Sequence, residues 1–269
     1  MDSRGVQAIE ADLMDHQSLH EALEGVDTVY NMASPMPGRA AEFMKVNTEG
    51  ILNLLEVATE VGVKTVVHLS TVDVCGFGAG RVPPGAPANP TGDYQKAKAE
   101  AERLLAESAK RSPLPRVVVI RSARAFGSRD WSLAAPLLQM IETGKVVLPS
   151  AGPMSFSHPL DVAKAMLVAG TGAVPSGSVF HVKSFDARPE ELARGLVAAT
   201  GAQADVRKEG LLSRSQLPAY TLGQLRAGLT VDADPGWKEL GYAPGMNLQA
   251  SCEEVARWYK KEPWAAGRA

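Results

Sequence analysis

Short apolar runs alternate with longer stretches of helical pattern through the first half of the chain, and this alternation limits the fold more than any other feature. The runs VQAIEA, DTVYNMA, TVVHLS and RVVVIRS are separated by stretches such as AEFMKVNTEGILNLLEVATEVG, whose apolar residues recur at helical spacing. Strands that alternate with helices predict βαβ units around a parallel sheet. The runs are nearly continuously apolar, as in strands covered on both faces. We therefore expect an α/β fold with a doubly wound parallel sheet.

The pattern loosens after Arg121 into segments rich in proline, glycine and serine. A chain of 269 residues can bury a full core as one large α/β domain, alone or with a smaller lobe. We expect residues 1–150 to form the core and residues 151–269 to supply the final sheet elements and a small lobe within the same structural unit. The predicted elements of this second half are helices near 132–143, 160–169, 189–200 and 251–260 and a strand at SVFHVKS.

Charge, cysteine content and hydropathy exclude several classes of protein. Charged residues make up 22% of the chain and the net charge is −2, so there is no basic field to hold nucleic acid. The two cysteines, Cys75 and Cys252, lie far apart with no CxxC motif or His/Cys cluster, which argues against disulfides and a metal site. No apolar signal core and no run of about eighteen apolar residues is present. We expect a cytoplasmic protein without metal, nucleic-acid or membrane partners.

Small and polar residues follow each predicted strand. In a doubly wound sheet, ligands bind outside the carboxyl ends of the strands. The residues at these ends are therefore candidates for a ligand site. They are Asp12 and Leu13 after the first run, Asn31, Met32, Ala33 and Ser34 after the second, Ser70 and Thr71 after the third, and Ser122 after the fourth.

A tyrosine and a lysine share one helix face in the segment DYQKAK. Tyr94 and Lys98 are four residues apart, so they lie one turn apart on the same side of a helix. A lysine cation stabilises phenolate and lowers the pKa of a tyrosine from about 10, as an acid/base group near neutral pH requires. Together with the Thr71 hydroxyl, the pair suits hydride transfer between a nicotinamide and a carbonyl or alcohol. The spacing alone is a weak signal.

Eight segments, taken in order, resemble one enzyme family. They are EADLMD, VDTVYNMAS, VNTEGILNLLEVA, VVHLSTVDVCG, DYQKAKAEAERLL, VVVIRSARAFG, FSHPLDVAKAML and ELGYAP. In this order and spacing the chain is similar to the extended short-chain dehydrogenase/reductase family, the NAD-dependent epimerase/dehydratase group. The resemblance implies a Rossmann-like dinucleotide-binding core within residues 1–150, a small substrate lobe within residues 151–269, and NAD or NADP as cofactor.

The resemblance also implies a role for each candidate residue. Tyr94 would be the catalytic acid/base, Lys98 its partner and a ligand of the nicotinamide ribose, and Thr71 the hydroxyl that orients the substrate. The implied cofactor contacts are Asp12 on the adenine amino group with Leu13 beside it, Met32, Ala33 and Ser34 along the cofactor path, Asn47 near the nicotinamide, and Ser122 after the sixth strand of the family fold.

Two of these residues have a structural alternative. Asp12 could cap the helix that follows it, which is a common role of aspartate before a helix. Asn47 could be a polar residue on a helix face. In this context we favour the cofactor role for both residues.

The sequence departs from the family pattern at its beginning. The glycine-rich phosphate loop of the family belongs roughly fifty residues before the segment VQAIEADL, and that segment starts here at residue 6. We expect the first strand, the phosphate loop, the first helix and the second strand to be absent, along with the residue that selects NAD or NADP. Dinucleotide binding is then expected to be weak, because such a loop neutralises the pyrophosphate.

Two positions bear on the substrate. Arg124 stands where sugar-nucleotide members of the family carry an asparagine, and Met154 stands where they commonly carry an arginine that binds the diphosphate. The expected function is therefore an NAD(P)-dependent oxidoreductase acting on a less charged carbonyl/alcohol pair. The alternatives are a sugar-nucleotide epimerase or dehydratase and a non-catalytic binding protein. A small-molecule substrate is expected in either enzyme, and a homodimer is compatible with the sequence.

The first apolar run also raises a question about strand pairing. In the doubly wound order, Val6–Glu10 would normally pair with a strand that is expected to be absent here. We expect Val6–Glu10 to pair instead with Thr28–Met32, because the helix predicted over Asp15–Gly25 is long enough for a right-handed crossover between adjacent parallel strands. The alternatives are that another chain covers the exposed edge of Thr28–Met32 or that the early segment is loosely held.

Overall fold

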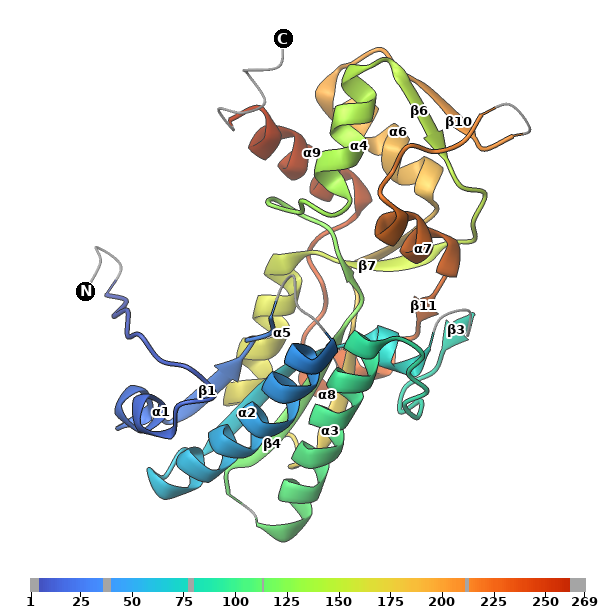
Figure 1. The fold of residues 1–269 in the computed structure, drawn as a ribbon. Helices are drawn as coiled ribbons and strands as arrows, with labels where there is room; N and C mark the ends of the chain where they lie inside the picture. The colour runs from blue at the N-terminus through green and yellow to red at the C-terminus, as the bar shows by residue number, and fades with distance from the viewer. Residues whose placement is uncertain (1–4, 36–39, 77–79, 113, 211–212, 262–269) are drawn as a thin grey trace. The chain divides into compact units, whose positions relative to one another are not determined.

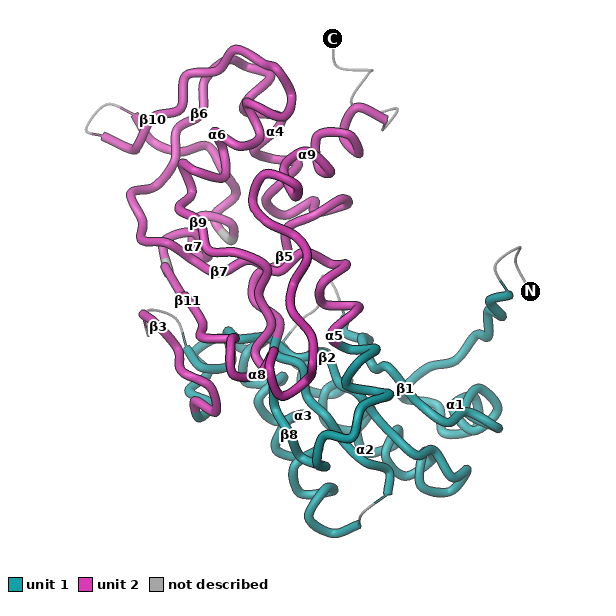
Figure 2. Tube along the Cα trace, turned by 180° about the vertical axis from the view of Figure 1, so that it is seen from behind, with its two compact units in different colours: residues 1–76, 87–121, 166–180 teal, residues 77–86, 122–165, 181–269 magenta. Residues whose placement is uncertain are grey.

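The computed structural model describes residues 5–35, 40–76, 80–112, 114–210 and 213–261 of the chain. These residues form two compact units, shown in different colours in Figure 2. The first unit combines residues 1–76, 87–121 and 166–180, and the second combines residues 77–86, 122–165 and 181–269. The units interleave along the chain, with changes of unit at residues 77, 87, 122, 166 and 181, and the division of the chain at residue 150 stays a prediction.

A parallel sheet forms the centre of the first unit. Within the described residues it has four strands in the order β1-β2-β4-β8, namely β1 (Thr28–Asn31), β2 (Thr65–Thr71), β4 (Arg116–Ser122) and β8 (Ser178–Val182). β1 and β2 run parallel, with Thr28 opposite Thr65 and Asn31 opposite His68. The predicted α/β fold with a parallel sheet is confirmed.

Helices cover both faces of this sheet, as the continuously apolar strands predicted. α1 (His16–Leu23), α2 (Ala40–Glu60) and α3 (Asp93–Arg111) lie on one face, and α2 and α3 lie side by side (Figure 1). Val29 and Val66 on this face pack against Leu54 and Val57 of α2. Tyr30 alternates with Val29 along β1 and points to the other face, where it contacts Gly170 near the end of α5 (Pro159–Thr171).

The close approach of Tyr30 to Gly170 gives a testable prediction. A Cβ atom at position 170 would lie 2.8 Å from both Cε1 and Cζ of Tyr30, closer than carbon atoms pack. Gly170→Ala is therefore expected to lower the free energy of unfolding by about 1–3 kcal/mol, measured by chemical denaturation. Gly223→Ala is the matched control, because nothing lies within 4 Å of its Cβ position in α7 (Ala219–Ala227), and it should stabilise the protein by up to about 1 kcal/mol. Equal effects at both positions would contradict the packing argument.

The predicted pairing of Val6–Glu10 with Thr28–Met32 is wrong. Residues 6–10 form no strand, and β1 pairs with β2 at one end of the strand order in the described residues. Val6 and Ile9 leave 58% and 50% of their surface exposed. These two side chains are three residues apart, so a strand would direct them to opposite faces and neither face would gain a continuous apolar row.

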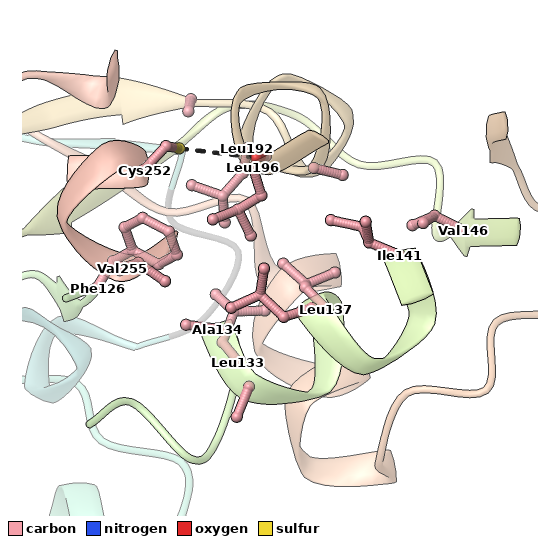
Figure 3. Packing of buried hydrophobic residues seen from close by; sticks show 14 of the residues in the cluster. Phe126, Leu133, Ala134, Leu137, Ile141, Val146, Leu192, Leu196, Cys252 and Val255 are labelled. Atoms are coloured by element: carbon pink, nitrogen blue, oxygen red, sulfur yellow. Dashed lines mark hydrogen bonds between the residues drawn. The ribbon is translucent and has the colours of Figure 1, made fainter. Parts of the chain in front are cut away.

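The second unit has a core of its own, built from α4 (Ala134–Glu142), α6 (Pro189–Thr200) and α9 (Leu248–Tyr259). Figure 3 shows Leu137 and Ile141 of α4 and Leu192 and Leu196 of α6 facing one another, with Val255 of α9 beside them. These helices and α5 fall within a few residues of their predicted positions. The further elements are α7 and α8 (Asp234–Leu240), β6 (Lys145–Leu148) paired with β10 (Asp205–Lys208), β3 (Arg81–Val82) paired with β11 (Thr230–Val231), and the sheet β5 (Arg124–Ala125), β7 (Met154–Ser157) and β9 (Phe185–Ala187).

Candidate active site

The start of α3 is fixed by one glutamine side chain. Oε1 of Gln95 accepts hydrogen bonds from the backbone N–H of Thr91 at 2.8 Å and of Gly92 at 2.9 Å, and from the Thr91 hydroxyl at 3.0 Å. These contacts satisfy donors just before the first turn, where a helix lacks internal partners. They set the position at which α3 begins, and Tyr94 lies in that first turn.

Lys98 is buried one turn after Tyr94, with 2% of its surface exposed. Its Nζ donates a hydrogen bond to the backbone carbonyl of Leu69 in β2 at 3.1 Å. Tyr94 is half-buried, and its ring packs edge to face on Phe43 of α2 with centroids 5.5 Å apart. The two residues therefore share the face of α3 that is turned toward β2, as their spacing predicted.

Thr71 ends β2, two residues after the carbonyl that Lys98 binds. Its Oγ1 accepts the backbone N–H of Asp73 at 3.2 Å and caps the short 3-10 helix η1 (Val72–Cys75), which α3 contacts. The Thr71 hydroxyl proton is not used by this bond. The structure thus places Thr71 and the Lys98 ammonium at the same end of β2, with Tyr94 one helical turn before Lys98 on α3.

Burial shifts the pKa values of Lys98 and His68, two buried side chains near the end of β2. It lowers the pKa of Lys98 to about 8, although the carboxylate of Glu102 acts in the opposite direction. Burial and the nearby Lys98 cation hold the pKa of His68 well below its ordinary value. His68 is therefore neutral at pH 7. Its Nδ1 lies 3.2 Å from Nδ2 of Asn31, an amide donor, so the ring proton sits on Nε2.

A buried network beside Lys98 was not predicted from the sequence. Arg121 donates to the Glu102 carboxylate through Nε, at 3.1 Å from both oxygens, and through Nη2, at 2.7 Å from Oε2. The Ser70 hydroxyl donates to Oε1 of Glu102 at 2.5 Å. Two signals pointed to this network: Glu102 follows Lys98 by one helical turn, and Arg121 is a charged residue at the end of an apolar run.

The predicted residues after β1 lie on a loop that Asn31 holds. Oδ1 of Asn31 accepts the backbone N–H of Ala33 at 3.1 Å. Met32 and Ala33 are exposed at this strand end. The hydroxyl oxygen of Ser34 is buried and has no hydrogen-bond partner among the described residues. A buried hydroxyl in that state is available to a bound group.

Asp12 and Leu13 lie in the turn before α1, where Asp12 is exposed and Leu13 is half-buried. Oδ1 of Asp12 accepts the N–H of Met14 at 2.9 Å, and the carbonyl of Leu13 accepts Nδ2 of Asn53 from α2 at 2.9 Å. The side chain that caps α1 is Asp15, whose Oδ1 accepts the N–H of Gln17 and Ser18. The alternative in which Asp12 caps this helix is therefore wrong, because the helix begins three residues later than that alternative requires.

The side chains of two other predicted residues donate hydrogen bonds to backbone carbonyls close by in the sequence. Asn47 is buried in α2, and its Nδ2 donates to the carbonyl of Phe43 one turn earlier at 2.9 Å. Ser122 ends β4, and its hydroxyl donates to the carbonyl of Ala123 at 2.8 Å. The cofactor roles of both residues stay predictions.

A family model settles the classification of the chain. The model for the NAD dependent epimerase/dehydratase family matches residues 2–182, which is more than half of the 269 residues. The chain belongs to the NAD-dependent epimerase/dehydratase family. The predicted resemblance is confirmed.

Members of this family and related proteins match the chain over different lengths. An N-acetyl-alpha-D-glucosaminyl-diphospho-ditrans,octacis-undecaprenol 4-epimerase from Escherichia coli O157:H7 is 32% identical over 145 residues, which are 52% of this chain and 44% of that protein. The chain thus aligns with less than half of that epimerase. A 4-hydroxy-2-methyl-3-oxo-4-farnesyl-3,4-dihydroquinoline-1-oxide ketoreductase from Stigmatella aurantiaca is 26% identical over 281 residues, covering 93% of this chain and 83% of the relative.

A solved structure supports the fold. The dTDP-glucose 4,6-dehydratase from Bacillus anthracis str. Ames, in complex with NAD, matches with a TM-score of 0.78 at 18% identity, covering 97% of this chain and 82% of that chain. At this identity the likeness shows the fold alone. Among the described residues, no helix has both the length and the apolar character needed to cross a bilayer.

Proposed function

We propose that this chain transfers a hydride between the nicotinamide of NAD or NADP and a small carbonyl or alcohol substrate. The observation that carries the proposal is the buried Lys98 ammonium, which is bonded to the Leu69 carbonyl at the end of β2. That bond brings Lys98 to the strand that ends in Thr71, with Tyr94 one turn away on the same helix face. A phenol, a cation and a hydroxyl in this arrangement suit proton transfer to or from an oxygen that is being reduced or oxidised.

Each of the three side chains has a separate task. In the reducing direction, the Thr71 hydroxyl donates a hydrogen bond to the substrate carbonyl oxygen and orients it. Tyr94 gives its phenolic proton to that oxygen as the carbonyl carbon gains the hydride, and the Lys98 cation stabilises the resulting phenolate. The bound nicotinamide supplies the hydride, or accepts it in the oxidising direction. In that direction, the Tyr94 phenolate takes the proton of the substrate hydroxyl.

The residues present fit a dinucleotide. The buried Ser34 hydroxyl offers an unused hydrogen-bonding group, and the exposed Asp12 carboxylate can accept a bond from an adenine amino group. Lys98 has three donor protons and would bind the nicotinamide ribose with one of them. Leu13, Met32, Ala33, Asn47 and Ser122 complete the proposed cofactor contacts.

A sugar-nucleotide epimerase or dehydratase is the second candidate. The activity named for the Escherichia coli 4-epimerase, which is 32% identical over 145 residues, favours it. The buried Met154 and the Arg124 side chain, which bonds the Ser132 hydroxyl at 3.1 Å, favour a less charged substrate. The same three residues would serve both reactions, since an epimerase or dehydratase returns the hydride to its own substrate.

Cofactor turnover and product analysis separate these candidates. The chain is incubated with NADH or NADPH and a panel of ketones, and in parallel with NAD and nucleotide sugars. Net consumption of the reduced cofactor supports the oxidoreductase, whereas an isomerised or dehydrated sugar without net turnover supports the second candidate. Dinucleotide binding without any conversion would support a third reading, a non-catalytic binding protein, and no binding at all would contradict all three.

The pKa of Lys98 predicts the pH dependence of the reaction. Lys98 must carry its proton to stabilise the Tyr94 phenolate, and burial lowers its pKa to about 8. The value of kcat/KM is expected to fall up to about tenfold per pH unit above that point. Lys98→Arg keeps a cation at every accessible pH, so its residual activity should lack this fall. A fall that persists unchanged in Lys98→Arg would assign the titrating group elsewhere.

A further inference from the structure

Two buried hydrogen bonds tie neighbouring residues of β2 to α3. Lys98 Nζ binds the carbonyl of Leu69, and the hydroxyl of the next residue, Ser70, binds the carboxylate of Glu102 at 2.5 Å. Lys98 and Glu102 lie one turn apart on the same face of α3. The helix is therefore held to the strand at two points, and its position along the strand is fixed at the turns that follow Tyr94.

The Glu102 carboxylate is also held by β4, the third strand in the sheet order. Arg121 of β4 binds both oxygens of Glu102, and the two residues are only 6% and 7% exposed. Ala97 and Ala101, which are 0% exposed on α3, leave room for the helix to approach the sheet closely. A planar guanidinium that holds both carboxylate oxygens leaves little freedom for Glu102 to turn.

We infer that Ser70, Glu102 and Arg121 form a positioning cluster that sets where Lys98 and Tyr94 stand relative to the end of β2. This inference rests on the proposed function of Tyr94 and Lys98. Ser70 and Glu102 join β2 to α3 one turn after Lys98, so the cluster acts through Lys98 and through the position of α3 along the strand. A displacement of about 1 Å in a reacting group can cost about a hundredfold in rate.

The charges of the cluster make the inference measurable. Lys98 interacts electrostatically with the Glu102 carboxylate of α3 and with neutral His68 of β2. Glu102 in turn pairs with Arg121 of β4, which also contacts the Cys75 thiol at 3.5 Å, and Tyr94 lies one turn before Lys98 on α3. Arg121 balances the negative charge of Glu102. Removing the carboxylate takes away the negative charge with which both Lys98 and Arg121 interact, whereas removing the guanidinium leaves Lys98 as the remaining cation near a buried carboxylate.

The two single substitutions are therefore expected to shift the pKa of Lys98 in opposite directions. Glu102→Gln should lower the pKa of Lys98 and Arg121→Gln should raise it, each by about one unit or more. The measurement is a pH titration of the ¹³Cε resonances in lysine-labelled protein, with the Lys98 signal assigned from Lys98→Met. Glu100→Gln is the control, because its carboxylate bonds Arg103 on the partly exposed side of α3, and it should leave the Lys98 signal unchanged.

Kinetics separate this inference from the proposed function. In Glu102→Gln the fall of kcat/KM at high pH should move to lower pH by the same amount as the Lys98 titration. If neither single variant folds, Glu102→Gln/Arg121→Gln removes both members of the buried ion pair together, and kcat is expected to drop at least about tenfold with KM little changed. Lys98 titrations that do not move in the single variants, or an unchanged kcat in the double variant, overturn the inference. Shifted titrations in a chain without any hydride transfer uphold the cluster and overturn the proposed function.

Discussion

Replacing Tyr94 with phenylalanine is expected to lower the rate of hydride transfer by about 10³-fold, because the substitution removes the only proton that the proposed mechanism moves. The ring would keep its edge-to-face contact with Phe43, and Lys98 would keep its bond to the Leu69 carbonyl. The thermal midpoint should therefore stay within about 2 °C of the parent protein. Single-turnover oxidation of the reduced cofactor, read beside a melting curve, tests both statements.

Tyr30→Phe is the matched control for this substitution. Tyr30 lies in the same unit and also loses one phenolic hydroxyl, but its side chain points to the α5 side of the sheet, away from α3. Its rate should stay within about twofold of the parent. A Tyr94→Phe protein that retained most of its activity would move the acid/base role to another group.

Asp161 is expected to be the costliest single position in the second unit. Its carboxylate is fully buried and accepts four hydrogen bonds, from the Tyr242 hydroxyl at 2.6 Å, the Gly245 N–H at 2.8 Å, the Ser184 hydroxyl at 2.5 Å and the Met246 N–H at 3.1 Å. In Asp161→Asn the amide nitrogen would face two of these donors. We expect a loss of about 3–5 kcal/mol in the free energy of unfolding, since buried donors would lose a charged acceptor.

The same carboxylate gives the protein part of its acid sensitivity. Burial acts to raise the pKa of Asp161, but the four donors outweigh it and hold the pKa below its ordinary value. The stabilisation is therefore present above the ordinary pKa of aspartate and is lost as the pH falls through the lowered value. Denaturation curves should show stability that declines less steeply in acid for Asp161→Asn than for the parent protein. Equal slopes in the two proteins would refute this assignment.

Asp232→Asn serves as the control for both measurements. Asp232 pairs with Arg81, whose side chain is 71% exposed, so solvent screens the pair. Its loss should cost less than about 1 kcal/mol. A comparable loss at Asp161 would mean that the donors around it find other partners.

The sequence alone was enough to predict the sheet and its helices. Continuous apolar runs can be buried only between two layers, so strands with helices on both faces followed from the order of the segments. The spacing of Tyr94 and Lys98 likewise required a shared helix face. The same local pattern gave a wrong prediction for Val6–Glu10, because a strand also needs a neighbouring strand to pair with and an apolar face to bury. Only the tertiary structure shows that this segment forms no strand and leaves its apolar side chains exposed.

The surroundings of the site depended on contacts between distant parts of the chain. Glu102 and Arg121 are ordinary charged residues in the sequence, and they become a buried pair only when α3 settles against β2 and β4. The lowered pKa of Lys98 has the same origin, since it comes from water excluded by that packing. Residue identity and spacing therefore determined which groups can do chemistry, while burial, which no local pattern encodes, decided their charge and their neighbours.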